Sequence, residues 1–291
     1  MDMSYGIIDA HIHLNHLSDE SLKALLSQAK KSGIAFFVNN GIKQILNPQS
    51  VVMTDSMIKN AVGISHHLSN ADFFQSRYGL SHDEMILMMK DFFKKPGVIA
   101  IGEVGLEIPP KGTDDIAHYN SYRNKPFNDL TEFPSVDEQL TLLLKQFDLA
   151  AELGVPVICH SGNSNQIFSD LLKKQRWNNL KGMIHGFTGT EKELEDFISM
   201  GVYVSVNHSI FYSKHSKALQ AILNMGLNRY LLVETDSPGF HPDNEDEINS
   251  FESIHLLINK LADHFGVSAK QVIEVTSQNT TTLFNLKGGC K

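Results

Sequence analysis

The stretch VDEQLTLLLKQFDLAAELGVPVICHS, residues 136–161, contains one complete unit of the expected fold. Apolar residues recur three and four positions apart through Val136–Leu153, a spacing that predicts an α-helix with one buried face. The apolar stripe consists of Leu140, Leu143, Leu144, Phe147, Ala150 and Ala151. Gly154 predicts the end of the helix, and the apolar run Val155–Cys159 predicts a buried strand directly after it. His160 follows, so the unit delivers a histidine to the carboxyl end of a strand.

Further apolar runs alternate with helical patterns along the whole chain. The eight predicted strands are Gly6–His11, Ala35–Asn39, Ala61–Ile64, Val98–Gly102, Val155–Cys159, Gly182–His185, Val202–Val206 and Tyr230–Glu234. Eight such units favour a closed (β/α)8 barrel, a TIM barrel of the α/β class, over an open doubly wound sheet. Two final helices, Ser253–Phe265 and Ser268–Ser277, complete the fold. We expect residues 1–291 to form a single domain, since such barrels commonly reach about 250 residues.

Residues 109–134 interrupt this alternation. The segment is polar and dotted with aromatic residues, and its length of about 25 residues exceeds that of an ordinary connection. We expect an insertion after the fourth strand, over the top of the barrel. Its aromatic residues either anchor it to the barrel or stack on unpaired bases, and it is a candidate contact for a protein partner.

The composition restricts the partners and the compartment. A net charge of -8 argues against a broad basic surface for duplex DNA, although cations at a site can still hold a nucleic acid locally. The two cysteines, Cys159 and Cys290, cannot form a disulfide framework, and the first residues lack a signal-peptide pattern. We therefore expect a cytoplasmic protein. No apolar run approaches the roughly 18 residues of a membrane span, so no membrane partner is expected.

Two predicted strands end in residues that can bind metals. His11 and His13 are two residues apart at the end of the first strand, so both side chains can face one cation. Two chance surface histidines are the ordinary alternative, but the position at a strand end favours ligands. Glu103 follows the fourth apolar run, and a glutamate is costly to bury there unless it is paired or bound to a metal.

Three further strands end in His160, His185 and Asp236. One buried histidine is more often satisfied by a hydrogen bond, but such residues from five strands would all lie at the catalytic face of a barrel. The predicted ligands of a two-cation centre are His11, His13, Glu103, His160, His185 and Asp236. Two such cations would lie about 3.5–4 Å apart, bridged by a carboxylate. Imidazole and carboxylate ligands suit Zn²⁺ or Mn²⁺ and an oxygen-rich site suits Mg²⁺, so the metal stays open.

In this order, the motifs DAHIHL, GEVGLE, PVICHS, IHGFTG, ETDSP and QNTTTLF resemble those of the TatD family of metal-dependent deoxyribonucleases, a branch of the amidohydrolase-like barrels. The resemblance spans almost the whole chain. It implies two ligand sets: His11, His13, Glu103 and Asp236 for one cation, and Glu103, His160 and His185 for the other, with Glu103 as the bridge. Many amidohydrolases bridge with a carbamylated lysine, so the glutamate favours the TatD-like branch.

The resemblance also implies an activity, because members of the family typically trim DNA, often single-stranded, from the 3′ end. We therefore expect a 3′-5′ exodeoxyribonuclease whose DNA substrate is single-stranded and whose catalytic residues are Glu103 and Asp236. Asp236 would orient a metal-bound water or accept its proton. Two alternatives stay open: a small-molecule amidohydrolase that cleaves an amide, lactone or cyclic ester, and a defence-system or regulatory component.

The chain departs from the family pattern beside the expected site. Gly162 and Asn163 stand where the family has an Arg-Asp pair, and Ser65 stands where it has the first histidine of Gly-x-His-Pro-His. These losses put phosphate recognition in doubt. Glu107 replaces a usual aspartate, and Thr282 replaces an arginine with an expected effect on packing. Because the ligands are intact, we expect a divergent substrate rather than an inactive enzyme.

Candidate substrate-binding residues follow two other strands. His67 lies after the third strand, where His66 is an equal candidate, and Asn207 and His208 lie after the seventh. Residues at these strand ends share the catalytic face of a barrel, although a solvated loop is the ordinary alternative.

Overall fold

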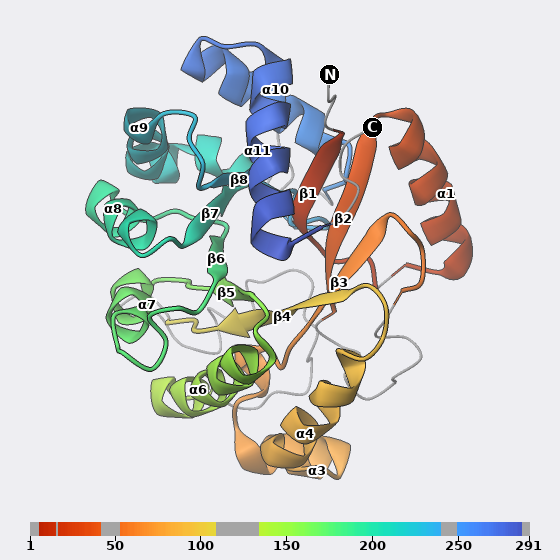
Figure 1. The fold of residues 1–291 in the computed structure, drawn as a ribbon, viewed down its shortest axis with the longest axis vertical. Helices are drawn as coiled ribbons and strands as arrows, with labels where there is room; N and C mark the ends of the chain where they lie inside the picture. Colours follow the sequence, from red (N-terminus) through yellow and green to blue (C-terminus); the bar gives the residue numbers. More distant parts are fainter. Residues whose placement is uncertain (1–5, 16, 42–52, 109–133, 240–248, 287–291) are drawn as a thin grey trace.

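The computed structural model describes residues 6–15, 17–41, 53–108, 134–239 and 249–286. In this part of the chain, parallel strands follow one another in chain order around a single sheet, with helices outside it (Figure 1). The strands are β1 (Ile7–Ile12), β2 (Ile34–Gly41), β3 (Ile58–Val62), β4 (Val98–Gly105), β5 (Val157–His160), β6 (Gly182–His185), β7 (Tyr203–Val206) and β8 (Leu231–Val233). Hydrogen bonds from Asp236 N to His11 O (2.9 Å) and from His13 N to Ser237 O (3.0 Å) join its two ends. The predicted (β/α)8 barrel is confirmed.

The helices form the outer layer in Figure 1. They are α1 (Asp19–Lys31), α3 (Ala71–Tyr78), α4 (His82–Phe92), α6 (Val136–Leu153), α7 (Asn165–Leu172), α8 (Glu191–Ser199), α9 (Ser216–Met225), α10 (Ser253–Phe265) and α11 (Ala269–Phe284), with short 3₁₀ turns η1 (His66–Leu68), η2 (His208–Phe211) and η3 (Ser213–His215). Helix α6 has the predicted bounds because its ends are well capped. Ser135 and Glu138 form a capping box at its start, and Gly154 adopts a left-handed conformation (φ 66°) at its end.

The buried face of α6 is rotated from the predicted stripe. Phe147 and Ala150 are buried as expected, whereas Ala151 is exposed. The same face carries a buried glutamine, Gln146, whose amide both accepts from Ile64 N (2.7 Å) and donates to Ile64 O (2.9 Å). The amide provides hydrogen-bond partners that the backbone of Ile64 would otherwise lack. An apolar pattern in the sequence does not reveal a buried polar residue of this kind.

Three predicted elements have a boundary that is wrong by three or more residues. Strand β3 spans Ile58–Val62 rather than Ala61–Ile64. Strand β4 continues past Gly102 to Gly105, because its end pairs with β5, so Glu103 lies inside the strand rather than after it. Helix α11 continues past Ser277 to Phe284. Its last apolar residues belong to a cluster whose other buried members come from the strands and from Leu286, just after the helix. Burial of this helix end extends the helix beyond the point where its sequence turns polar.

The barrel interior is apolar, and its carboxyl end is polar. The buried strand residues of the interior cluster are Ile8, Ala10, Val38, Ala61, Ala100, Ile158, Met183 and Leu232. A second and larger cluster fills the space between the strands and the helices. The two clusters leave the strand ends to buried polar residues, and these build the site described below.

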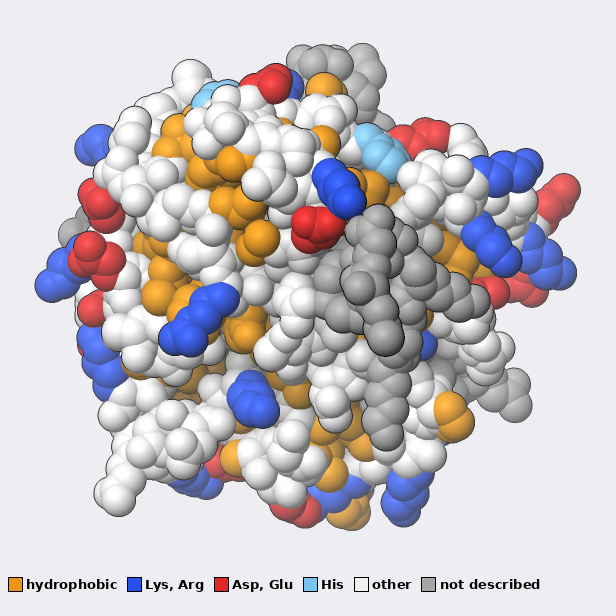
Figure 2. Space-filling view, turned by 45° about the horizontal axis from the view of Figure 1, so that its top comes forward, with side chains coloured by type: hydrophobic (Ala, Val, Ile, Leu, Met, Phe, Trp, Pro, Cys, Tyr) orange, Lys and Arg blue, Asp and Glu red, His pale blue; other side chains and the backbone are white. Residues whose placement is uncertain are grey.

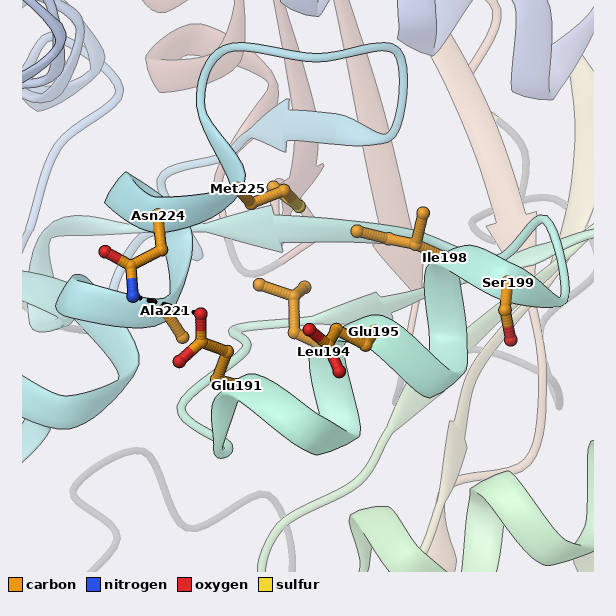
Figure 3. Close-up of a pocket in the computed structure, with 8 residues that line it drawn as sticks. All are labelled: Glu191, Leu194, Glu195, Ile198, Ser199, Ala221, Asn224 and Met225. Atoms are coloured by element: carbon orange, nitrogen blue, oxygen red, sulfur yellow. Dashed lines mark hydrogen bonds between the residues drawn. The ribbon is translucent and has the colours of Figure 1, made fainter.

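The outer surface is mixed in character. Lys and Arg side chains are scattered among Asp and Glu on the face that Figure 2 presents, consistent with the net charge of -8. A groove of about 340 Å³ lies between α8 and α9 (Figure 3), where Asn224 Nδ2 donates to Glu191 Oε1 at 3.0 Å. Its lining includes none of the predicted site residues.

Some expectations concern residues beyond this description. The predicted insertion, residues 109–134, lies outside the described residues except for Pro134, so its aromatic side chains and its proposed partner contact stay predictions. Among the helices that the structure describes, none combines the length and the apolar character needed to cross a membrane.

Candidate metal centre

The barrel brings all six predicted ligands together. They come from β1 and its end (His11, His13), from β4 (Glu103), from the ends of β5 and β6 (His160, His185) and from the residues after β8 (Asp236). Glu103, His11 and His185 are almost fully buried, and Asp236 is 9% exposed. Parallel strands place their carboxyl ends at one edge of a barrel, which explains why residues far apart in the sequence meet here.

The first donor set has four ligand atoms. His11 Nε2 and His13 Nε2 lie 3.2 Å apart, and Asp236 Oδ1 lies 3.4 Å and 3.2 Å from them. Glu103 Oε2 is 3.6 Å from each of the two nitrogens. Ligands about 2.1 Å from a tetrahedral cation are roughly 3.4 Å from one another. The four atoms therefore have the spacing of a cation site.

The second donor set uses the other oxygen of Glu103. Glu103 Oε1 lies 3.0 Å from His160 Nδ1 and 3.0 Å from His185 Nε2, and the two nitrogens are 2.9 Å apart. One carboxylate therefore faces both sets, one oxygen to each. This is the arrangement of a bridging carboxylate between two cations.

The ring planes sort the histidines into the same two sets. His11 and His13 meet at 83° and His160 and His185 at 40°, so each pair can direct lone pairs at a common point. His11 and His185 are stacked at 7°, and one cation cannot lie in the plane of two parallel rings. A single cation could therefore not be held in the ring planes of both histidines.

Two histidines of the centre, His160 and His185, hold their protons more strongly than usual at positions where a cation would bind. Burial lowers the pKa of His160, but hydrogen bonds to Glu103 and Glu107 outweigh this and raise it to about 9. Burial likewise opposes the charge of His185, and Glu103 nevertheless raises its pKa well above the usual range. The pKa of Glu103 lies well below its usual range, because His185 and the other histidines outweigh its burial. The imidazole and carboxylate donors of the centre are of the kinds that bind divalent cations.

Cation binding will therefore release protons. In the cation-free protein the proton on His160 stabilises the fold fully below pH 6.5, and this contribution is lost as the pH rises through about 9. We expect Zn²⁺ binding at pH 7.5 to release about one to two protons per protein and apparent affinity to rise up to about pH 9. Calorimetry in buffers of different ionisation enthalpy measures the number; a value of zero at pH 7.5 would contradict the prediction.

Asp9 and Thr235, to which sequence reasoning gave no role, fix the backbone beside the ligands. Asp9 is fully buried and accepts hydrogen bonds from Thr235 Oγ1 (2.6 Å), Thr235 N (3.0 Å) and His11 N (3.2 Å). Burial raises its pKa to about 7. Asp236 has a positive φ of 51°, a conformation that is costly for a non-glycine residue and that clusters at functional sites.

The predicted substrate-binding residues lie close to the centre but differ in their contacts. Asn207 Nδ2 donates to Glu234 (3.2 Å), and His208 is buried with its ring 5.7 Å from Phe211. His67 lies beside His66, with ring centroids 4.1 Å apart. A role in substrate binding stays a prediction for all three.

His66 contacts a predicted ligand, His160. It is 3% exposed, and its ring is stacked on that of His160 at 4.6 Å and 18°. Donor atoms of His66, Glu107 and His160 lie within 4.8 Å of one another. The two rings are nearly parallel, however, so these residues do not share a third cation. The sequence signal for His66 is its position shortly after β3, which it shares with His67.

The residues that depart from the family pattern have ordinary contacts. Ser65 Oγ accepts from His67 N (3.4 Å), and Asn163 Nδ2 donates to Ile108 O (2.9 Å). Thr282 is exposed and its hydroxyl donates to Gln278 O (2.8 Å). The side chain lies on the solvent face of α11, and the expected effect of Thr282 on packing stays a prediction.

A (β/α)8 barrel with histidine, glutamate and aspartate donors at its carboxyl end defines a metal-dependent hydrolase of the amidohydrolase-like class. The family model for TatD-related DNase matches residues 8–285, and the chain belongs to this family. It is accordingly a hydrolase that acts on ester bonds.

Individual relatives agree with this assignment. The chain is 26% identical over 287 residues to deoxyribonuclease TATDN3 of Homo sapiens, covering 96% of this chain and 94% of the relative. It is 28% identical over 199 residues to the 3′-5′ ssDNA/RNA exonuclease TatD of Shigella flexneri, covering 66% and 68%. The structure of the TatD homologue YJJV from Escherichia coli superposes with a TM-score of 0.74 at 21% identity, covering 96% and 98%, which shows the shared fold.

Proposed function

We propose that the chain is a 3′-5′ exodeoxyribonuclease that hydrolyses single-stranded DNA with two divalent cations. The observation that carries the proposal is Glu103, whose two oxygens face two separate sets of donors. The family assignment supports a nuclease, and the name of the Shigella flexneri relative supports a single-stranded substrate and 3′-5′ polarity.

The residues of the site divide the work. When bound, the cations supply Lewis-acid activation of a water molecule and of the phosphoryl oxygens. Glu103 would contact both cations and so fix the distance between them. The four histidines would supply uncharged nitrogen ligands. Asp236, whose carboxylate lies beside His11 and His13, would orient the attacking water or accept its proton. Near-complete burial of His11 and Glu103 keeps bulk water from the inner side of the centre.

Metal removal tests the proposal. We expect EDTA to lower hydrolysis of a 5′-labelled single-stranded oligonucleotide by more than about 10³-fold, and Mn²⁺, Zn²⁺ or Mg²⁺ to restore it, because the chemistry needs an activated water. The products should shorten one nucleotide at a time from the 3′ end.

Substrate controls separate the alternatives. A duplex of the same sequence should be cut more slowly, and a circular single strand should not be cut at all. Absence of cleavage with every metal would refute a nuclease. Turnover of a lactone or amide by the same preparation would then select the small-molecule alternative.

A further inference from the structure

Two buried carboxylates outside the six ligands contact the second donor set. Glu107, after β4, is 3% exposed, and Glu234, after β8, is fully buried. Glu107 Oε2 lies 2.8 Å from His160 Nε2, and Glu234 Oε1 lies 3.5 Å from His185 Nδ1. In each histidine the opposite ring nitrogen faces Glu103. His160 therefore lies between two carboxylates at hydrogen-bond distance, whereas Glu234 lies beside His185 Nδ1 without making a hydrogen bond to it.

The first donor set lacks this arrangement. His13 Nδ1 lies 2.8 Å from the backbone oxygen of Asn40, which is an uncharged acceptor. His11 Nδ1 has no hydrogen-bond partner among the described residues. In the described part of the chain, the outer nitrogens of the predicted histidine ligands therefore meet carboxylates only in the second set.

The backbone and surroundings of Glu107 fix its position. Gln139, buried on α6, accepts from Glu107 N (2.7 Å) and donates to Glu107 O (3.1 Å). Gly162 leaves room for the carboxylate, because a Cβ at this position would lie 2.8 Å from Glu107 Oε2. The glutamate that replaces the usual aspartate thus uses space left by the glycine that replaces the usual arginine.

Glu234 is fixed by its own hydrogen bonds. Gly186 N donates to Oε1 at 2.8 Å, and Asn207 Nδ2 donates to the same oxygen at 3.2 Å. The hydroxyl of Ser205 donates to Oε2. These hydrogen bonds hold the carboxylate beside His185. The side chain of Asn207 thus has a structural partner, Glu234, whether or not it binds substrate.

A neutral imidazole carries its proton on one nitrogen only, and the hydrogen bond of the outer nitrogen decides which. A carboxylate at the outer nitrogen keeps the proton there, so the inner lone pair stays free for a cation and becomes more basic. We propose that Glu107 and Glu234 are positioning residues that strengthen the second cation site selectively: Glu107 fixes the tautomer of His160 through a hydrogen bond, and the buried carboxylate of Glu234, 3.5 Å from His185 Nδ1, favours a proton on that nitrogen electrostatically. This rests on the proposed two-cation centre.

Zn²⁺ titrations of the full chain test the proposal. We expect Glu107→Gln and Glu234→Gln each to raise the Kd of the Zn²⁺ held by His160 and His185 by about 10–100-fold, while the Zn²⁺ held by His11 and His13 binds as before. The ¹⁵N shifts of the histidine rings identify which site is filled. Glu195→Gln, a change of the same type at an exposed residue of α8, should alter neither Kd.

Imidazole NMR of the wild-type protein gives a second measurement that needs no variant. In the Zn²⁺-loaded chain we expect the proton on Nε2 of His160 and on Nδ1 of His185. The opposite tautomers would overturn the proposal, as would variants in which neither site weakens or both weaken equally. These measurements do not depend on turnover, so a protein that passes them without cutting DNA would refute the proposed nuclease and leave this inference standing.

Discussion

Glu103→Gln will reduce hydrolysis by at least about 10³-fold and will weaken the binding of both cations. The reason is the geometry of one side chain: Oε2 faces His11 and His13, and Oε1 faces His160 and His185. Glutamine offers one oxygen and one N–H donor, so one donor set loses its acceptor and meets a donor instead. Cation content by mass spectrometry and oligonucleotide hydrolysis measure the two effects.

The same variant has a readout without metal. Burial lowers the pKa of His185 and Glu103 raises it, so loss of the carboxylate should move this pKa down toward or below its usual value. Histidine NMR of the cation-free variant follows the titration. A variant that keeps two equivalents of Zn²⁺ and wild-type hydrolysis would show that Glu103 does not bridge the two sets. Glu195→Gln controls for the loss of a carboxylate elsewhere.

The clustering of the six predicted ligands could be predicted from the sequence because the geometry of a parallel barrel brings its strand ends together. A ligand such as His185 follows a recognisable apolar run, and all strand ends of a parallel barrel meet at one edge. The only spatial information needed is therefore which residue ends each strand. Even the error at Glu103, predicted to follow its strand, did not move it from the site, because β4 extends along the same direction.

The supporting residues could not be found in this way. The positions of Glu107 and Glu234 depend on side-chain contacts across the barrel, and Gln139 is a polar residue on the buried face of α6. Apolar periodicity treats such residues as interruptions. The sequence did not distinguish His66 from His67, because alternation along a strand stops being informative where a 3₁₀ turn begins.

One motif residue of the sequence, Gly105, has a structural role that only the packing reveals. Gly105 ends β4 and pairs with His160 at the end of β5, and Leu106 N donates to His160 O at 2.9 Å. A Cβ at residue 105 would lie 1.9 Å from that oxygen, a distance at which the backbone itself must move. The two strand ends must therefore separate in any variant that has a side chain here.

Gly105→Ala will consequently destabilise the fold and displace a ligand together. We expect the free energy of unfolding in EDTA to fall by about 3 kcal/mol, which lowers Tm by about 6–12 °C. Hydrolysis should fall further than the folded fraction does, because His160 shifts with its strand even in folded molecules. Thermal melts and single-turnover assays at a temperature where the variant is folded separate the two effects.

Gly41→Ala is the matched control, because Gly41 also ends a strand, β2, and the nearest atom to its added Cβ would be 3.5 Å away. This is an ordinary contact, so the control should melt close to wild type and retain its hydrolysis. If Gly105→Ala behaves like the control, β4 and β5 are not in contact at their ends as described. His160 would then owe its position to Glu103 and Glu107 alone, through the contacts of its two ring nitrogens.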